Sequence, residues 1–361
     1  MKGAVLSLGS KSSKMTVEAM KKYFDVVEDV NLKSVEVMLG RKGMSILYNG
    51  KPLPKYDCIY AKGSFRYAPL LRSLTTALYD TTYMPIKPNS FTIGHDKLLT
   101  HLALQYYKIP MPDTYVVPSI GAAKKILEQI SYPIVIKFPH GTQGKGVMFA
   151  ESFAAASSML DAIEGLRQPF LIQEYIETEG SDIRAIVIGD KVAASMKRNA
   201  VKGEKRANIH AGGKGEPIIL DTLTKKIAVN TAKSIGAEIC AVDILETVRG
   251  PEVIEANLSP GLQGITSVTK IDVADNIASY LHEKTKEFVE RGKSTEASKV
   301  FMDLGVARAD KSGAEQQVVT NLDFRSERIL LPKIISNIAN FAESDEVVIK
   351  AQKGKITLEK Y

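Results

Sequence analysis

A glycine-rich stretch, KFPHGTQGKGVMFAE at residues 137–151, constrains the fold more than any other segment of the chain. Gly141, Gly144 and Gly146 fall close together between the apolar runs PIVIKF and VMFAE. Glycine lets a backbone approach a phosphate closely and offer its N–H groups as donors. The spacing matches neither the P-loop, G-x-x-x-x-G-K-[ST], nor the dinucleotide fingerprint G-x-G-x-x-G. The stretch therefore predicts a phosphate-covering loop between two strands, of another type.

Strand-like apolar runs and helical segments alternate through most of the chain, which is typical of an α/β fold. GAVLSLG and YDCIYAKG read as strands, and TVEAMKKYF places Val17, Met20 and Phe24 at helical spacing. Prolines between residues 85 and 118 mark a passage between domains, and GKSTEASK at 292–299 reads as a linker. We expect four regions: an N-terminal α/β domain at 1–90, a central lobe with the glycine loop at 91–180, a C-terminal lobe at 181–291, and a β-rich extension at 300–361.

Composition favours a cytoplasmic enzyme. The net charge of +7 permits acidic partners without requiring them. Cys58 and Cys240 lie in apolar runs, where free cysteine behaves as a small core residue, and no signal peptide or membrane span is expected. The five histidines lack zinc spacing such as H-E-x-x-H, and no G-x-S-x-G elbow is present. Nucleophilic hydrolysis is therefore disfavoured.

Polar residues on two strands predict a metal site. Strand alternation in EVIEANLS places Glu255 and Asn257 on one face, and pairing about the Arg249–Gly250 turn would bring Asp243 alongside them. Three hard oxygen ligands suit Mg²⁺. The alternative is that these residues line a solvated sheet face. Lys137 ends the strand PIVIKF and faces the glycine loop, and Glu174 and Tyr175 end a third strand, FLIQEYI, where the backbone would read adenine.

Taken in order, six segments resemble the ATP-grasp carboxylate–amine ligases, and within them the RimK-like alpha-L-glutamate ligases. The segments are GHDKLLTHLAL, IVIKFPHGTQGKGVMFAES, FLIQEYIETEGSDIRAIVIGDKVAAS, RANIHAGG, AVDIL and EANLSPGLQGI. The resemblance covers roughly residues 1–290 and implies an α/β (α+β) ATP-grasp fold with an N-terminal open-sheet pre-ATP-grasp domain. The small β-rich C-terminal extension lies outside the resemblance and is expected from its own sequence pattern.

The resemblance also implies the site residues and the cofactors, ATP with Mg²⁺ or Mn²⁺. The ATP-binding residues it implies are Lys97, Lys137, Gly141, Gln143, Gly144, Gly146, Glu174, Tyr175, Asp182, Arg206, Ala207 and Asn208. The catalytic residues it implies are Arg184, Arg198 and Arg206: Arg184 and Arg198 would lie near the transferred phosphoryl group and the substrate carboxylate, and Arg206 belongs to the segment that contacts the nucleotide and the acyl phosphate. Asp243, Glu255 and Asn257 would bind the metal.

The implied reaction activates a carboxylate as an acyl phosphate and joins it to an amine, releasing ADP and phosphate. L-glutamate is the expected amine, and the acceptor is a carboxylate on a coenzyme or a protein tail. Ala211, Lys197 and Asn199 depart from the RimK pattern, so a carrier-protein ligase of the lysine-biosynthesis type or a glutathione-synthetase-like ligase remains an alternative.

The segment RILLPKIISNIANFAESDEVVIKAQKGKITLEK at residues 328–360 carries L-P-K, then E-x-D-E-V, then G-K-I-x-L, and it loosely resembles AbrB-type swapped hairpins. This raises a second alternative, a nucleotide- or DNA-binding regulator. Basic and acidic residues are mixed in this tail, which disfavours nucleic acid as a partner. We expect the tail to support a homo-oligomer, a dimer or a tetramer, and we expect no membrane partner.

Overall fold

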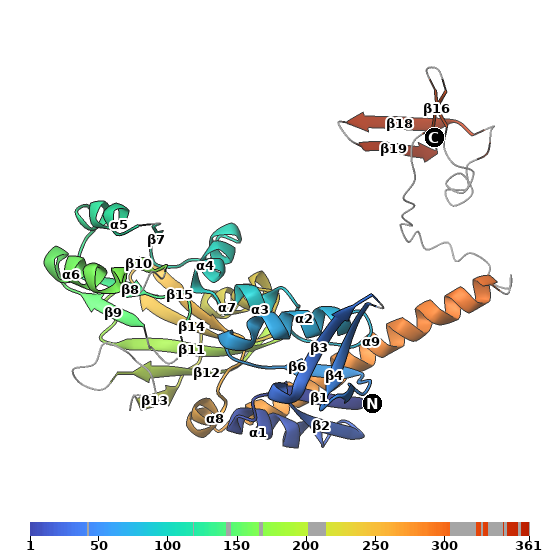
Figure 1. The fold of residues 1–361 in the computed structure, drawn as a ribbon, viewed down its shortest axis with the longest axis horizontal. Coiled ribbons are helices and arrows are strands. Elements are labelled where there is room, and N and C mark those ends of the chain that lie inside the picture. The colour runs from blue at the N-terminus through green and yellow to red at the C-terminus, as the bar shows by residue number, and fades with distance from the viewer. Residues whose placement is uncertain are drawn as a thin grey trace. The chain divides into compact units, whose positions relative to one another are not determined.

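The computed structural model describes residues 1–41, 43–117, 119–141, 146–165, 169–200, 214–303, 323–325, 328–330, 342, 345–352 and 355–360. The chain divides into two compact units, Met1–Ser294 and Thr295–Tyr361, and each is described by itself (Figure 1).

The first unit begins with a three-stranded parallel sheet. Its strands, in the order β2-β1-β6, are β1 (Lys2–Ser7), β2 (Val26–Asn31) and β6 (Cys58–Ala61). Helix α1 (Lys11–Met20) begins earlier than the predicted segment, because the Ser10 hydroxyl accepts a hydrogen bond from the Ser13 N–H and caps the first turn. Val17, Met20 and Phe24 are buried, as their spacing predicts.

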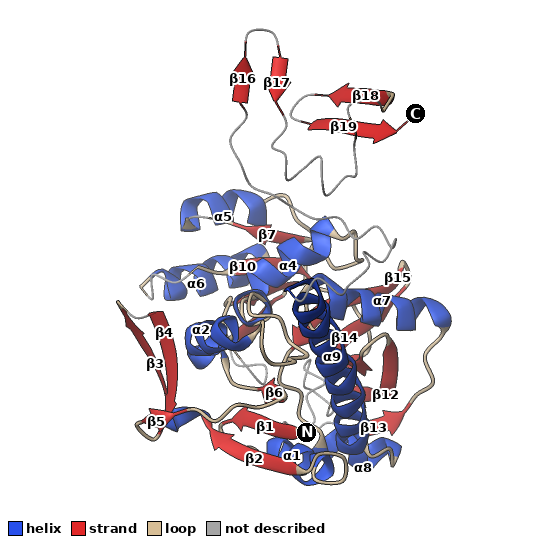
Figure 2. Cartoon of the chain, turned by 90° about the vertical axis from the view of Figure 1, so that its right-hand side faces the viewer, coloured by secondary structure: helices blue, strands red, loops and turns tan. Residues whose placement is uncertain are grey.

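A second, antiparallel sheet extends from this domain in Figure 2. It consists of β3 (Val35–Gly40), β4 (Gly43–Tyr48) and β5 (Lys51–Pro52). Asn49 and Gly50 have φ values of 52° and 72°, so the predicted tight turn is confirmed. The helical elements that complete the region and lead into the next are η1 (Leu32–Ser34), η2 (Phe65–Tyr67), α2 (Ala68–Leu78), α3 (Ser90–Ile93) and α4 (Lys97–Tyr106).

A four-stranded antiparallel sheet carries the glycine loop. Its order is β7-β10-β8-β9, and its strands are β7 (Thr114–Val116), β8 (Ile134–Lys137), β9 (Val147–Ala150) and β10 (Leu171–Glu174). Helices α5 (Ile120–Leu127) and α6 (Phe153–Glu164) pack on it and on each other. This lobe has a hydrophobic core of its own, separate from the core of the rest of the unit.

A five-stranded antiparallel sheet forms the remainder of the first unit. Its order is β13-β12-β11-β14-β15, and its strands are β11 (Ser181–Ile188), β12 (Lys191–Asn199), β13 (Lys214–Pro217), β14 (Ile239–Thr247) and β15 (Gly250–Asn257). Helices α7 (Thr222–Ser234), α8 (Gln263–Thr269) and α9 (Val273–Asp303) accompany it. Its core is continuous with that of the N-terminal sheet, and Cys58 and Cys240 are both buried in this core, as expected.

The second unit contains two hairpins among its described residues, β16 (Asp323–Arg325) with β17 (Arg328–Leu330), and β18 (Val347–Gln352) with β19 (Lys355–Lys360). The boundary between the two units, Ser294/Thr295, falls within the predicted linker at residues 292–299. The segment is helical, however, because α9 continues through it to Asp303. GKSTEASK contains no proline, and its lysines, glutamate and alanine favour helix once a long helix already precedes them.

Across the described part of the chain, none of the helices has the length and apolar character needed to cross a bilayer.

Candidate active site

Four charged side chains of β11, β12 and β14 form one buried network. Arg184 donates from Nε and Nη2 to the two carboxylate oxygens of Asp243, at 2.8 and 2.7 Å. Arg198 donates to both oxygens of Asp182 at 2.6 Å, and its Nη2 also lies 3.0 Å from Asp243 Oδ2. The strand register explains these pairs, because Arg184 lies opposite Asp243 and Asp182 lies opposite Arg198.

This network shifts the pKa values of its two carboxyls in opposite directions. Burial and the neighbouring Asp243 raise the pKa of Asp182 to about 6, against the opposing effect of Arg198. Burial works against ionisation of Asp243, but Arg184 and Arg198 outweigh it and lower the pKa of this carboxyl. Arg198 is buried, whereas the Arg184 side chain is 17% exposed. Arg198 therefore holds the two aspartates from a buried position, and Arg184 is the more exposed of the two arginines.

The predicted metal residues lie side by side on β14 and β15. Asp243 pairs with Glu255 and Ala241 pairs with Asn257, so the turn brings the two strands together as expected. The Glu255 side chain is 41% exposed and its Oε1 lies 3.9 Å from Lys97 Nζ. Asn257 Oδ1 accepts a hydrogen bond from the Ser259 N–H at 3.0 Å. Among the described residues, no three His, Cys, Asp or Glu side chains are grouped so that they could hold a metal ion.

The donor chemistry of this edge fits a hard cation in part. The Glu255 carboxylate and the Asn257 amide oxygen keep lone pairs that could bind Mg²⁺. Both oxygens of Asp243 already accept hydrogen bonds from guanidinium groups. Glu255 and Asn257 are thus the residues best placed to hold the metal, with Asp243 beside them.

Two lysines face the same space from the root of the glycine loop. The Lys97 backbone N–H donates to the Pro139 carbonyl at 3.1 Å, and its Nζ donates to the Gly141 carbonyl at 3.2 Å. Lys137, the last residue of β8, donates from Nζ to Gln173 Oε1. Burial lowers the pKa of Lys137 to about 8, with Glu255 opposing this shift and Lys97 adding to it. These three charges therefore act on one another.

A polar chain that sequence reasoning missed connects the two lysines. Gln173 Nε2 lies 2.9 Å from His101 Nε2, and His101 Nδ1 lies 2.6 Å from the Lys97 carbonyl oxygen. Burial lowers the pKa of His101 to about 4, so the ring is neutral. Its Nε2 then accepts from the Gln173 amide, and its Nδ1–H donates to Lys97. A glutamine within the apolar run FLIQEYI was the available signal.

Gly146 ends the glycine loop in a backbone conformation that side chains rarely adopt. Its φ is +78°, and a Cβ atom there would lie 2.9 Å from Phe138 Cδ2. The Phe138 N–H also donates to the Gly146 carbonyl at 3.1 Å, closing the loop across β8 and β9. Five of the predicted site residues lie outside the described residues, namely Gln143, Gly144, Arg206, Ala207 and Asn208.

The segment predicted to read adenine is tied to the neighbouring sheet. The Glu174 N–H donates to the Asp113 carbonyl at 2.9 Å, and its carboxylate accepts from Arg249 Nη2 at 2.8 Å. Arg249 Nε also donates to Glu252 at 2.8 Å. The Tyr175 ring packs edge-on against Phe149, with ring centres 5.8 Å apart. The sequence indicated only a turn at Arg249 and not its role in linking the two lobes.

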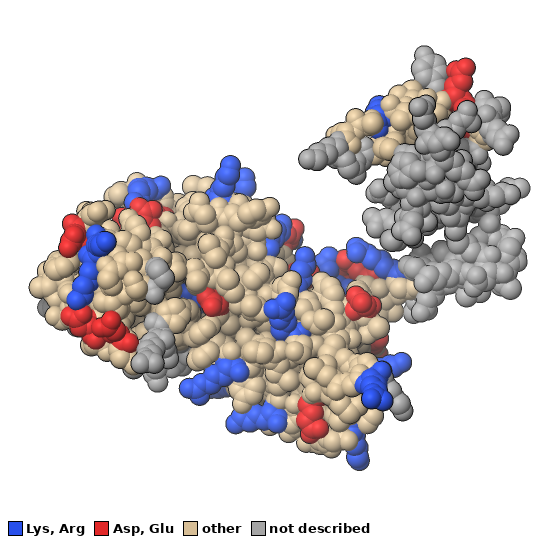
Figure 3. Space-filling model, turned by 45° about the horizontal axis from the view of Figure 1, so that its top comes forward, with Lys and Arg blue, Asp and Glu red and all other residues tan. Residues whose placement is uncertain are grey.

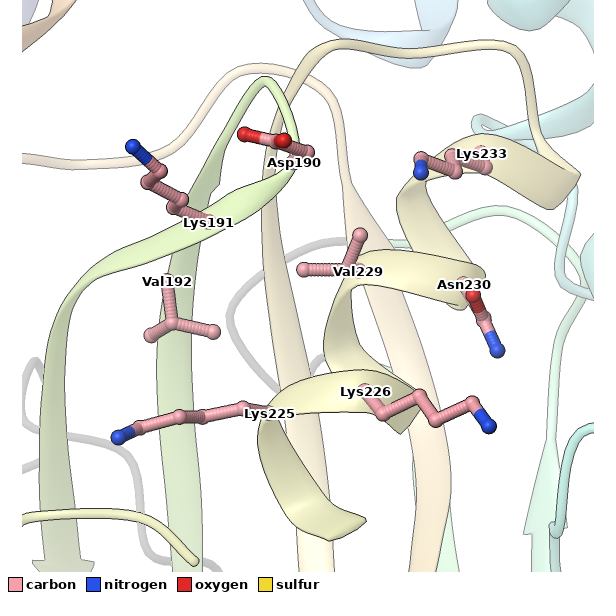
Figure 4. A pocket seen from close by; sticks show the side chains of 8 residues that line it. All are labelled: Asp190, Lys191, Val192, Lys225, Lys226, Val229, Asn230 and Lys233. Atoms are coloured by element: carbon pink, nitrogen blue, oxygen red, sulfur yellow. The ribbon is translucent and has the colours of Figure 1, made fainter. Parts of the chain in front are cut away.

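A hollow of about 520 Å³ lies elsewhere, between α7 and the turn that joins β11 and β12 (Figure 4). Four lysines and an aspartate contribute its charged groups, and they are exposed. None of the predicted site residues lines it. Its residues are Asp190, Lys191, Val192, Lys225, Lys226, Val229, Asn230 and Lys233.

A glycine-loop lobe facing a second antiparallel sheet with acidic strands defines the ATP-grasp fold. The RimK domain ATP-grasp protein of Sphaerobacter thermophilus shares this fold, with a TM-score of 0.61 at 21% identity, over 78% of this chain and 99% of that one. The ATP-grasp ligase PsnB, solved with a phosphomimetic variant of its minimal precursor, Mg and ADP, has a TM-score of 0.58 at 19% identity, over 79% of this chain and 98% of its own.

Sequence comparison defines the family more narrowly. The model of the RimK-like ATP-grasp domain matches residues 94–281. A probable alpha-L-glutamate ligase of Xanthomonas oryzae pv. oryzae (strain MAFF 311018) is 33% identical over 294 residues, 79% of this chain and 99% of that protein. The chain therefore belongs to the RimK-like ATP-grasp family, and it is an ATP-dependent ligase that forms C–N bonds.

Proposed function

We propose that the chain joins L-glutamate, through its α-amine, to a carboxylate at the glutamate-like end of an acceptor. A carboxylate oxygen of the acceptor attacks the terminal phosphorus of ATP, which releases ADP and leaves an acyl phosphate. The amine then attacks the acyl carbon, so that the C–N bond forms, phosphate leaves and the amine gives up a proton. No protein nucleophile takes part.

The observation that carries this proposal is the convergence of Lys97, Lys137 and Glu255 at the root of the glycine loop. Two ammonium groups beside a backbone loop suit a polyphosphate chain, and a carboxylate on the opposite strand suits the cation that accompanies it. The choice of glutamate is supported by the name that the matching relatives carry, probable alpha-L-glutamate ligase.

Each residue has a physical role in this scheme. Lys97 and Lys137 neutralise phosphate charge, and the His101–Gln173 chain links the Lys97 backbone carbonyl to the Lys137 ammonium. Arg184, held by Asp243, presents a positive edge to the transferred phosphoryl group. Glu255 and Asn257 would hold Mg²⁺, which supplies charge compensation at phosphoryl oxygens when bound.

The proposal is tested by measuring ADP release with a panel of amino acids and candidate acceptors. The acceptors are N-acetyl-L-glutamate, a peptide that ends in glutamate, and a coenzyme with a glutamate-ended tail. We expect ADP release that requires both L-glutamate and an acceptor, and a product heavier than the acceptor by one glutamate residue. Lys137→Met serves as the matched inactive control.

Two outcomes would contradict the proposal in different ways. AMP as the primary nucleotide product would show that the acyl group is adenylated and not phosphorylated. Turnover with a neutral amino acid or with a cysteinyl acceptor, but not with glutamate, would be consistent with the ligase reaction. It would exclude glutamate as the amine substrate. The same panel of amino acids and acceptors distinguishes the proposed reaction from the two alternatives, a carrier-protein ligase of the lysine-biosynthesis type and a glutathione-synthetase-like ligase.

A further inference from the structure

Lys62 carries a buried charge that the ATP site does not use. It directly follows β6, at the carboxyl edge of the parallel sheet, and its backbone N–H donates to the Leu6 carbonyl at 2.8 Å. Ligands of open α/β sheets bind outside this edge. The residue is 3% exposed, and within the described chain its Nζ has no hydrogen-bond partner.

The surroundings of Lys62 offer its ammonium little compensation. The closest interaction is with the Tyr60 ring, whose centre lies 5.3 Å from Nζ. The Tyr60 hydroxyl, two residues earlier on the same strand face, is also buried and has no partner among the described residues. Burial lowers the pKa of Lys62 to about 8, and no carboxylate contributes to this shift. An unpaired buried cation is costly unless an anion completes it.

The segment that begins at Lys62 touches both walls of the candidate active site. The Gly63 N–H donates to Ser259 Oγ at 3.0 Å, and Ser259 is the residue whose N–H is held by Asn257. Phe65 stacks on His140, with ring centres 5.7 Å apart and planes 5° from parallel. His140 is the residue directly before Gly141, the first glycine of the loop. Lys62 therefore lies where the N-terminal domain meets the metal strand and the glycine loop.

Among the described residues, the cations predicted for the active site are already engaged. Arg184 and Arg198, two of the three arginines expected to hold carboxylates, have their guanidinium groups bonded to Asp243 and Asp182. The third, Arg206, lies outside the described residues. Lys97 donates to the Gly141 carbonyl of the glycine loop, and Lys137 donates to Gln173 Oε1. A glutamate-like acceptor end has two carboxylates, of which one is activated, so the second requires a cation of its own.

We propose that Lys62 binds the carboxylate of the acceptor that is not activated, and so determines which carboxylate reaches the ATP. This inference rests on the proposed function. The ammonium ends a flexible four-carbon side chain, so rotation about its own bonds moves it from the Tyr60 ring toward the sheet edge without displacing β6. A carboxylate accepts from it and replaces the missing partner.

Isothermal titration of the full chain tests this, in the presence of a non-hydrolysable ATP analogue and Mg²⁺. The probe is N-acetyl-L-glutamate, with its two mono-amides as matched ligands. We expect Lys62→Met to weaken binding of the diacid by at least about tenfold. Lys62→Arg should stay within about threefold of wild type because it keeps the charge. Lys33→Met, at an exposed lysine of the same domain, is the control and should change nothing.

Two further measurements separate binding from folding. One mono-amide should bind wild type as weakly as the diacid binds Lys62→Met, and Lys62→Met should no longer discriminate between the two. Lys62→Met should melt at a higher temperature than wild type without ligand, because an unpaired buried charge is removed, and its affinity for the ATP analogue should be unchanged.

The inference would be overturned if wild type and Lys62→Met bound the diacid with equal affinity. It would also be overturned if Lys62→Met melted at a lower temperature than wild type, or if wild type did not bind the diacid. Because binding is measured without turnover, these results are distinct from failure of the proposed function. That failure would appear as ADP release that does not depend on glutamate.

Discussion

The charge of Lys137, which we expect to bind phosphate, destabilises the native protein when no ATP is bound. Its pKa is lowered from 10.5 to about 8, first by burial. The unfolded chain therefore binds a proton more readily than the native protein between pH 8 and 10.5, so this residue destabilises the native state most below pH 8, and the penalty is relieved as the pH rises through this window.

We expect Lys137→Met to raise the free energy of unfolding at pH 7 by about 1–2 kcal/mol without ATP, since loss of the hydrogen bond to Gln173 offsets part of the gain. The stabilisation that ATP and Mg²⁺ give to wild type should disappear in the variant. Denaturant melts at pH 7 and pH 10, with and without nucleotide, measure both effects. A variant that is less stable than wild type at pH 7 would identify Lys137 as a structural residue.

Residue-level prediction from sequence succeeded for side chains whose position follows from strand alternation. Glu255 and Asn257 alternate with Ile254 and Ala256. Asp243 lies opposite Glu255, although only because the register shifts between Asp243 and Ile244, since the register at the turn would place Asp243 opposite Ile254. The pairing of Arg184 with Asp243 was not predictable, because β11 and β14 are separated by the helix α7 and their register is set by packing. Lys62 gave no signal, since its burial depends on elements distant in sequence.

At the level of elements, Arg249 connects the β14–β15 turn to the end of β10 through its ion pair with Glu174. Arg249→Gln removes this connection from the segment that we expect to contact adenine. We expect KM for ATP to rise about threefold to tenfold with little change in kcat, because ground-state binding is lost and the phosphoryl-transfer groups are untouched. Steady-state kinetics with varied ATP measure this.

Arg41→Gln is the matched control for this variant, since Arg41 is exposed in the turn between β3 and β4. It should behave as wild type. An unchanged KM for Arg249→Gln, or an equal rise in the control, would show that the bridge does not position the nucleotide.

Element boundaries were less predictable than element types. The hairpin turn at Asn49–Gly50 followed from residues that tolerate positive φ, whereas the start of α1 depended on the Ser10 cap. Residues 292–299 resembled a linker by composition, yet they extend a helix that begins at Val273. Extending an existing helix costs less than starting a new one, so residues with modest helix propensity can continue a helix that they would not initiate. Composition alone does not reveal this.

At the scale of the whole molecule, the relatives match 79% of this chain over nearly their full length, and the family domain ends at residue 281. We propose that the C-terminal unit supports self-association and not the chemistry. A chain truncated after Asp303, which retains all of α9, should keep ADP-forming activity within about twofold and form a smaller oligomer. Light scattering after size exclusion, beside activity assays, measures both.

Truncation at residue 292 is the comparison, because it cuts α9 and should cost stability as well as association. An unchanged oligomer after either truncation would contradict the proposed role of the tail. Tight binding of the full chain to DNA, lost on truncation, would favour the regulator. On the face that Figure 3 shows, positive and negative side chains of the described residues are interspersed, without a continuous basic stripe.

The stack of Phe65 on His140 has one more consequence, which is optical. The chain contains no tryptophan, so an indole placed at position 65 would be its sole long-wavelength fluorophore. The stack joins the N-terminal domain to the root of the glycine loop. Emission from that single indole would therefore report, in real time, whether this contact persists when substrates are added.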